Sequence, residues 1–238
     1  MIFGRQSSTT LPKEKMRFFL DTANIEEIES RYDTGLIDGV TTNPTLILKS
    51  GRTQQEVIRE IAERYPQMES ISAEVVAETA DDMIAQAETY YPISPAVTIK
   101  VPCTPDGLYV CRELSRSLVK VNVTLIFSPV QAILAAKAGA KYVSPFVGRV
   151  DDNSFGGLCL VKDISNIYNK QKVFETEILA ASIRNVRDVG RAFEYGAHIC
   201  TIPPAVFGKM YNHVLTDAGL AQFDKDWENV SSKVQELR

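Results

Sequence analysis

The sequence predicts an α/β protein, a single parallel (β/α)8 barrel of the TIM-barrel type with one extra helix at its C-terminus. First, β-branched or aromatic runs alternate with helical stretches eight times within about 190 residues. Second, a chain of 238 residues with 45% hydrophobic residues has enough apolar material for one large core, so we expect one domain. Third, Ala-Gly-Ala at 138–140 and Tyr-Gly-Ala at 195–197 each join a helix to a strand, which is typical of an αβ repeat.

Eight short runs bounded by turn residues predict the strands: 18–20, 37–40, 71–76, 97–101, 118–127, 141–146, 174–181 and 197–202. In the fourth, Val97, Thr98, Ile99 and Val101 are β-branched and Pro102 stops the run. That length and composition suit a buried strand better than a helix.

A helical stretch follows each strand: 24–32, 53–65, 79–90, from 104 onward, 128–139, 161–170, 185–195 and from 203 onward. Capping residues mark several of the starts. Asn24 is an N-cap, and Thr53 with Glu56 has the spacing of a capping box. Thr104 and Ser128 each precede a proline, which is favoured at the first position of a helix.

The two ends of the chain are expected to lie outside the barrel, which we assign to residues 16–214. Residues 1–15 are polar with scattered positive charge and predict a disordered extension. Residues 215–238 predict a helix, because from Phe223 onward its apolar residues are spaced by four, three, four and three. This apolar stripe, which includes Trp227, would pack either on its own barrel or on a neighbouring subunit.

Composition excludes several classes of protein. The net charge is −4 with acids and bases interspersed, so nothing indicates a nucleic acid or an anionic membrane as partner. No apolar run reaches the roughly 18 to 20 residues of a membrane span. Four cysteines without a CxxC pair and without a secretion signal indicate reduced thiols in a cytoplasmic protein. Two histidines leave little material for a metal site, so we expect none.

Lys100 stands out because it lies in an apolar strand. Burial disfavours the charged form of a lysine and so lowers its pKa, and a neutral amine is a nucleophile. Lysines of this kind form Schiff bases with carbonyl substrates. The alternative is that Lys100 caps its strand and extends its amine into solvent.

Polar or ionisable residues follow seven of the predicted strands, where a barrel places its active site. They are Asp21, Asn43, Glu74, Lys100, Asn122 with Thr124, Ser144 with Phe146, and Ser182 with Arg184. Asp21 and Glu74 near a desolvated amine would act as proton-transfer groups. Arg149 and Arg184 follow adjacent strands and suit a phosphate, although surface ion pairing is the alternative for both.

Six ordered motifs resemble the transaldolase family over residues 17–228. They are Phe19-Leu20-Asp21-Thr22, Gly39-Val40-Thr41-Thr42-Asn43-Pro44, Ile99-Lys100-Val101-Pro102, Asn122-Val123-Thr124-Leu125-Ile126-Phe127-Ser128, Ser144-Pro145-Phe146-Val147-Gly148-Arg149 and Ala181-Ser182-Ile183-Arg184-Asn185. In length the chain is most similar to the small branch of the family, which includes the fructose-6-phosphate aldolases.

The resemblance implies a Schiff-base mechanism without metal or organic cofactor. Lys100 would be the Schiff-base lysine, and Asp21 the acid/base group at the hydroxyl where the carbon–carbon bond breaks. Glu74 would transfer protons through a water that it holds together with Thr124.

The resemblance also implies sugar-phosphate substrates and a homo-oligomer, either a pentamer or a decamer. Asn43, Asn122 and Ser144 would hold the three-carbon ketose fragment. Three further residues, Ser182, Arg149 and Arg184, would hold the phosphate.

Two positions favour a transaldolase of the pentose phosphate pathway over an aldolase. The similar aldolases carry glutamine in place of Glu74 and tyrosine in place of Phe146, and tyrosine has a hydroxyl that could protonate an enamine. Arg184 stands where the aldolase branch can carry lysine. The alternatives are a fructose-6-phosphate aldolase that releases free dihydroxyacetone and a non-catalytic barrel that binds sugar phosphates.

Overall fold

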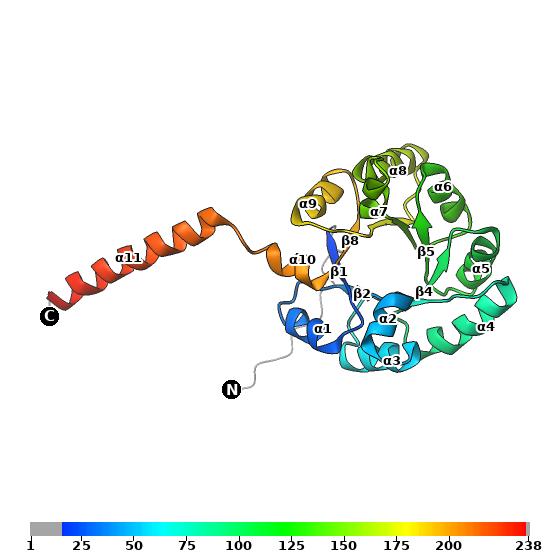
Figure 1. Ribbon diagram of the computed structural model, residues 1–238, viewed down its shortest axis with the longest axis horizontal. Coiled ribbons are helices and arrows are strands. Elements are labelled where there is room, and N and C mark those ends of the chain that lie inside the picture. Colours follow the sequence, from blue (N-terminus) through cyan, green and yellow to red (C-terminus); the bar gives the residue numbers. More distant parts are fainter. Residues whose placement is uncertain (1–15, 237–238) are drawn as a thin grey trace, which may run out of the picture.

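The computed structural model of the protein describes residues 16–236, with side chains up to residue 230. Eight parallel strands close into a barrel in the order β1-β2-β3-β4-β5-β6-β7-β8, and Figure 1 shows helices forming a ring around them. The predicted (β/α)8 barrel is therefore confirmed. The expectation of a disordered extension at 1–15 lies outside the described residues.

The strands begin and end close to the predicted positions: β1 Arg17–Asp21, β2 Gly39–Thr41, β3 Ser70–Glu74, β4 Val97–Pro102, β5 Val121–Ile126, β6 Tyr142–Pro145, β7 Glu177–Ala180 and β8 Ile199–Ile202. β5 begins later than predicted because Leu118 adopts a left-handed conformation (φ 62°) directly after the end of the preceding helix. β1 pairs with β8 and so completes the ring.

The helices and the short 3-10 helix η1 follow the strands: α1 Ile25–Tyr32, α2 Pro44–Ser50, α3 Gln54–Arg64, α4 Ala80–Tyr90, η1 Tyr91–Ile93, α5 Pro105–Arg116, α6 Pro129–Lys137, α7 Val147–Asp152, α8 Gly157–Gln171, α9 Val186–Glu194, α10 Pro204–Lys209 and α11 Val214–Glu236. Two short helices, α2 and α7, were not predicted. The start of α2 does carry a signal, since Asn43 caps Leu46 N and Pro44 is its first residue. In contrast, α7 has no side-chain N-cap, so its sequence offers no such signal.

The floor of the barrel, at the amino ends of the strands, is closed by a buried ion-pair cluster. Arg17 is 4% exposed and donates to Glu69 (2.5 Å) and to Glu177 (2.7 Å). Above it, apolar side chains including Phe19 and Tyr142 pack edge to face inside the barrel, with ring centroids 6.1 Å apart. We therefore look for the functional site at the opposite end, at the carboxyl ends of the strands.

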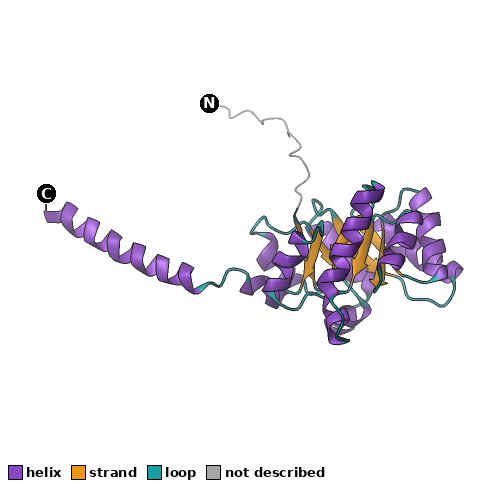
Figure 2. Ribbon diagram, turned by 90° about the horizontal axis from the view of Figure 1, so that it is seen from above, coloured by secondary structure: helices purple, strands orange, loops and turns teal. Residues whose placement is uncertain are grey.

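The C-terminal helix α11 extends away from the barrel, as Figures 1 and 2 show. Phe223 and Trp227 on this helix are 70% and 72% exposed. No helix in residues 16–236 is both long enough and apolar enough to cross a membrane.

Candidate active site

A cavity of about 490 Å³ opens at the carboxyl ends of the strands. Nine of the eleven residues predicted for the site line it: Asp21, Asn43, Glu74, Lys100, Asn122, Ser144, Phe146, Arg149 and Ser182. Residues distant in the sequence meet here because parallel strands of a barrel end on the same face. The other two predicted residues, Thr124 and Arg184, lie outside this lining.

Lys100 and Glu74 form an ion pair inside the cavity. Their Cα atoms are partners in the β3–β4 pairing, and Lys100 Nζ donates to Glu74 Oε2 at 2.8 Å. Lys100 Nζ also lies 3.3 Å from the carbonyl oxygen of Thr42. Because Lys100 is only 6% exposed, its amine does not extend into solvent as the alternative interpretation required. A nucleophile candidate therefore sits beside a carboxylate that can accept its proton.

Asp21 belongs to the same charged group. Burial raises the pKa of Asp21, whereas the hydrogen bond from Thr41 and the charge of Lys100 lower it, and the charge of Glu74 raises it. Thr41 Oγ1 lies 2.8 Å from Asp21 Oδ1 and 2.5 Å from Thr201 Oγ1. The net effect is a carboxylate with more affinity for a proton than an ordinary aspartate, which suits a general base.

Thr41 and Thr201 were not among the predicted site residues, although both line the cavity. Thr201 is in β8, the one strand to which the sequence assigned no functional residue, and Thr41 is part of a recognised motif. Their position at the ends of β2 and β8, on either side of β1, was the signal available in the sequence.

The wall formed by β5 and β6 carries polar atoms without partners. Ser144 Oγ donates to Asn122 Oδ1 at 2.8 Å. Asn122 Nδ2 and Thr124 Oγ1 are buried and have no hydrogen-bond partner among the described residues. Buried polar groups are normally satisfied, so these two atoms are expected to meet a substrate or water.

The backbone of this wall departs from regular strand geometry. The β5–β6 pairing shifts register between Val123 and Ile126, and Leu125 between them has φ 58°. This left-handed conformation is unfavourable for a leucine and is concentrated at functional sites when it occurs. Leu125 lines the cavity, whereas Thr124 is fully buried and is not part of that lining.

The corner formed by β6, α7 and β7 carries a second positive charge of the site, that of Arg149. The Arg149 guanidinium stacks over the Phe146 ring at 4.8 Å from its centroid, and Phe127 packs edge to face on the same ring. Ser182 has a left-handed backbone (φ 58°) and also lines the cavity. Arg149 makes no ion pair within residues 16–230, so its charge is free for an anion.

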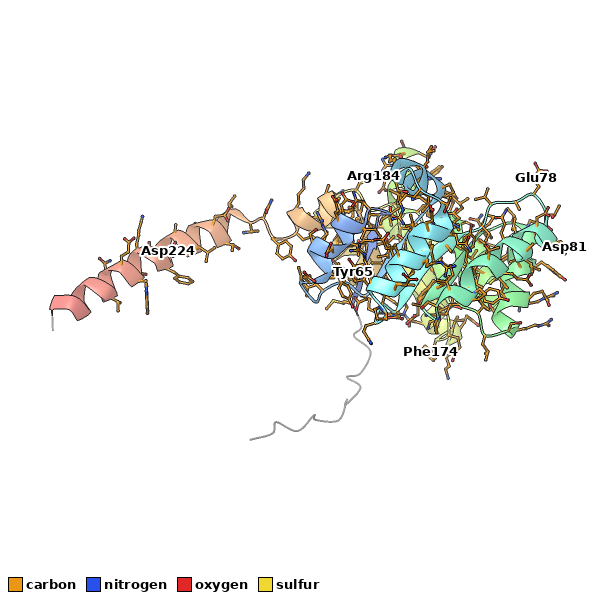
Figure 3. All side chains as sticks on the ribbon, turned by 90° about the horizontal axis from the view of Figure 1, so that it is seen from below. Tyr65, Glu78, Asp81, Phe174, Arg184 and Asp224 are labelled. Carbon is orange, nitrogen blue, oxygen red and sulfur yellow. The ribbon has the colours of Figure 1, made fainter. Side chains whose placement is uncertain are left out.

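Arg184 is placed differently from Arg149. Both of its terminal nitrogens donate to the carboxylate of Asp152, the last residue of α7. Figure 3 shows Arg184 and Phe174 at opposite ends of the barrel. The sequence did not identify Asp152, because nothing in its spacing relates it to Arg184.

Among the residues that the structure describes, no group of three or more His, Cys, Asp and Glu side chains is arranged to hold a metal ion. One of the two histidines, His198, accepts a hydrogen bond from Ile178 N through Nδ1 near the floor of the barrel, far from the cavity lining.

Comparison with known proteins gives a family match. The model of the family described as "Transaldolase/Fructose-6-phosphate aldolase" matches residues 18–234. Three similar proteins, each named "Probable transaldolase", come from Caulobacter vibrioides, Geobacter sulfurreducens and Symbiobacterium thermophilum. They are 53%, 50% and 48% identical, over 92%, 90% and 92% of this chain and 100%, 99% and 100% of their own lengths.

Proposed function

Because the chain belongs to the transaldolase/fructose-6-phosphate aldolase family, a family of enzymes, we propose that it transfers a dihydroxyacetone unit between sugar phosphates as a Schiff base on Lys100. The observation that carries the proposal is the buried Lys100 amine, 2.8 Å from Glu74 in a cavity that also holds Asp21. The family match confirms the resemblance to the transaldolase family and the prediction that the protein is an enzyme.

The first step forms the imine. Glu74 takes a proton from the Lys100 ammonium, and the free amine attacks the C2 carbonyl of fructose 6-phosphate. Glu74 then returns the proton, through a water at the Thr124 hydroxyl, so that the carbinolamine oxygen leaves as water. The partnerless Thr124 Oγ1 supports this placement of the water.

The second step breaks the carbon–carbon bond. Asp21 removes the proton from the C4 hydroxyl, the C3–C4 bond breaks, and its electrons move into the protonated imine. Glyceraldehyde 3-phosphate leaves, and the three-carbon unit remains on Lys100 as an enamine. Burial gives Asp21 the proton affinity that a general base needs.

The third step reverses the second with a new aldehyde. The enamine attacks C1 of erythrose 4-phosphate, and Asp21 returns its proton to the new alkoxide. Hydrolysis of the imine, again with Glu74, releases sedoheptulose 7-phosphate and free Lys100. No metal or organic cofactor enters these steps, because the imine itself accepts the electron pair.

Binding of the substrate is assigned to the polar walls. We place the hydroxyls of the three-carbon unit against Asn43, Asn122 and Ser144, where Asn122 Nδ2 supplies a donor without a protein partner. The phosphate is placed at Arg149 and Ser182, with Arg184 behind them, because a free guanidinium is the strongest anion partner at this corner.

We propose a transferase rather than a lyase because of Glu74, which the similar aldolases replace by glutamine, and because of Phe146. Its ring lines the cavity and offers no hydroxyl to protonate the enamine, so the three-carbon unit waits for an acceptor. An aldolase would instead release free dihydroxyacetone.

Product analysis with fructose 6-phosphate, alone and with erythrose 4-phosphate, tests this proposal. Sedoheptulose 7-phosphate formed only with the acceptor, and little free dihydroxyacetone in either case, is the expected result. Steady release of dihydroxyacetone without acceptor would identify an aldolase. Absence of a borohydride-trapped adduct on Lys100 in the folded protein would leave only a binding protein.

We also propose a cytoplasmic homo-oligomer, a pentamer or a decamer, in which α11 lies on a neighbouring subunit. The exposed Phe223 and Trp227 support this arrangement, because large apolar side chains on one helix face favour burial in an interface. Light scattering of the full chain measures the subunit number, and a monomer would contradict it.

A further inference from the structure

Two segments of chain supply the phosphate corner, and their backbones are joined. Arg149 belongs to α7, whereas Ser182 belongs to the loop between β7 and α9. The α7 amides donate to this loop: Val147 N to the oxygen of Ala181 at 3.0 Å, and Gly148 N to the oxygen of Ser182 at 3.1 Å. The relative position of the two segments therefore sets the geometry available to a phosphate.

The Arg184 side chain crosses from the loop to the far end of α7. Gly148 lies along this path: a Cβ at that position would lie 2.3 Å from the backbone oxygen of Ser182, 2.7 Å from Arg184 Nε and 2.9 Å from Arg184 Cδ. At the end of the path, the two terminal nitrogens of the guanidinium pair with the two carboxylate oxygens of Asp152. The side chains of Arg184 and Asp152 are 52% and 45% exposed, so this ion pair lies at the surface of the protein.

We propose that Asp152 is a positioning residue for phosphate recognition: it holds the Arg184 guanidinium in one orientation beside α7, the helix that carries Arg149. This inference rests on the proposed function, in which the corner binds a sugar phosphate. A guanidinium has five N–H donors, and an end-on pair with a carboxylate uses one from each terminal nitrogen. Three N–H donors of Arg184 therefore remain for a phosphate.

Preorganisation is the physical reason for such a residue. An arginine side chain loses rotamer entropy when a ligand immobilises it, and that loss weakens binding. Asp152 removes that freedom before the substrate arrives. The other charged residues of α7 have separate tasks, since Asp151 accepts from Gly157 N at 2.8 Å and Arg149 stacks on Phe146.

The sign of the effect separates positioning from simple electrostatics. A carboxylate near a phosphate site repels the ligand, so charge alone predicts tighter phosphate binding when Asp152 is neutralised. Positioning by Asp152 instead predicts weaker phosphate binding when Asp152 is neutralised. Asp152→Asn is expected to raise KM for erythrose 4-phosphate about 3- to 5-fold, the range of an exposed ion pair, with kcat within about 2-fold of wild type.

The experiment measures transfer from saturating fructose 6-phosphate to erythrose 4-phosphate and to D-erythrose, in the full chain. KM for D-erythrose, which has no phosphate, stays unchanged in Asp152→Asn, and Asp152→Glu recovers part of the lost affinity. Asp163→Asn, an exposed carboxylate on α8, controls for net charge and leaves both KM values unchanged.

A double-mutant cycle completes the test. If Asp152 acts through Arg184, Asp152→Asn adds nothing to the defect of Arg184→Gln. A lower KM in Asp152→Asn, an unchanged KM, or additive defects in the double variant would overturn the inference. Failure of the proposed function is distinguishable, because the wild-type protein would then show no transfer with either acceptor.

Discussion

The carboxylate of Asp21 and the hydroxyl of Thr41 meet at 2.8 Å at the ends of neighbouring strands β1 and β2. This hydrogen bond lowers the pKa of a carboxyl group whose burial raises it. Thr41 thereby adjusts the base strength of the group to which we assign bond cleavage.

Replacing Thr41 by valine removes that hydrogen bond at nearly constant volume. The pKa of Asp21 is then expected to rise further, because only the Lys100 charge still lowers it. A general base works in its ionised form, so the acid limb of the kcat/KM profile moves to higher pH. Thr22→Val is the control. Thr22 follows Asp21 in the sequence, but its hydroxyl donates to Glu27, so this variant should leave the acid limb in place.

Replacing Asp21 by asparagine separates imine formation from cleavage. Transfer is expected to fall by about 10²- to 10⁴-fold, while borohydride with fructose 6-phosphate still labels Lys100. Mass spectrometry of the labelled protein and product assays measure the two steps. Loss of the label would mean that Asp21 is needed for imine formation as well.

The same substitution tests stability. The folded-state pKa of Asp21 is raised above its unfolded value, so the charged carboxylate destabilises the fold at pH above that folded pKa. Asp21→Asn is therefore expected to raise Tm at neutral pH, and this gain disappears as the pH falls and wild-type Asp21 becomes protonated. Thermal unfolding at pH values from about 4 to about 8, a range that spans ordinary carboxyl and histidine pKa values, measures this difference in Tm. Equal Tm values for wild type and Asp21→Asn at every pH would contradict the raised pKa of Asp21.

Replacing Phe146 by tyrosine is expected to change the product. A hydroxyl on this ring would lie in the cavity, where it can protonate the enamine, so free dihydroxyacetone should appear without acceptor. Phe127→Tyr, on the ring that packs against Phe146, is the control with the same added hydroxyl. Unchanged products in both variants would remove Phe146 as the determinant.

Replacing Arg17 by methionine tests the floor of the barrel. Removing the guanidinium takes a cation from two partly buried carboxylates, those of Glu69 and Glu177, and should lower the free energy of unfolding by about 3 kcal/mol. Urea denaturation measures that loss. Because these residues do not line the cavity, kcat at a temperature where the variant is folded should equal that of wild type.

Local sequence signals determined how much of this molecule could be predicted. The eight strands and most helices were found because β-branched runs, caps and prolines are short-range features. Nine of the eleven proposed site residues line one cavity because a barrel brings strand ends together, and that follows from the fold alone.

The missed features depend on contacts distant in sequence. α7 starts without a side-chain cap and is tied by its amides to the oxygens of Ala181 and Ser182. The partner of Arg184, Asp152, lies 32 residues earlier in the chain. The register shift beside Leu125, which lines the cavity, depends on how β5 pairs with β6. None of these can be read from periodicity.

The separation of the ion-paired floor from the polar mouth has a consequence for evolution and engineering. For the transfer that we propose, residues around the opening can be varied to accept other aldehydes while Arg17, Glu69 and Glu177 continue to hold the strands at the far end. Libraries confined to the rim should therefore retain a high proportion of folded members, and new acceptor preferences can be selected on this scaffold without compensating mutations in its interior.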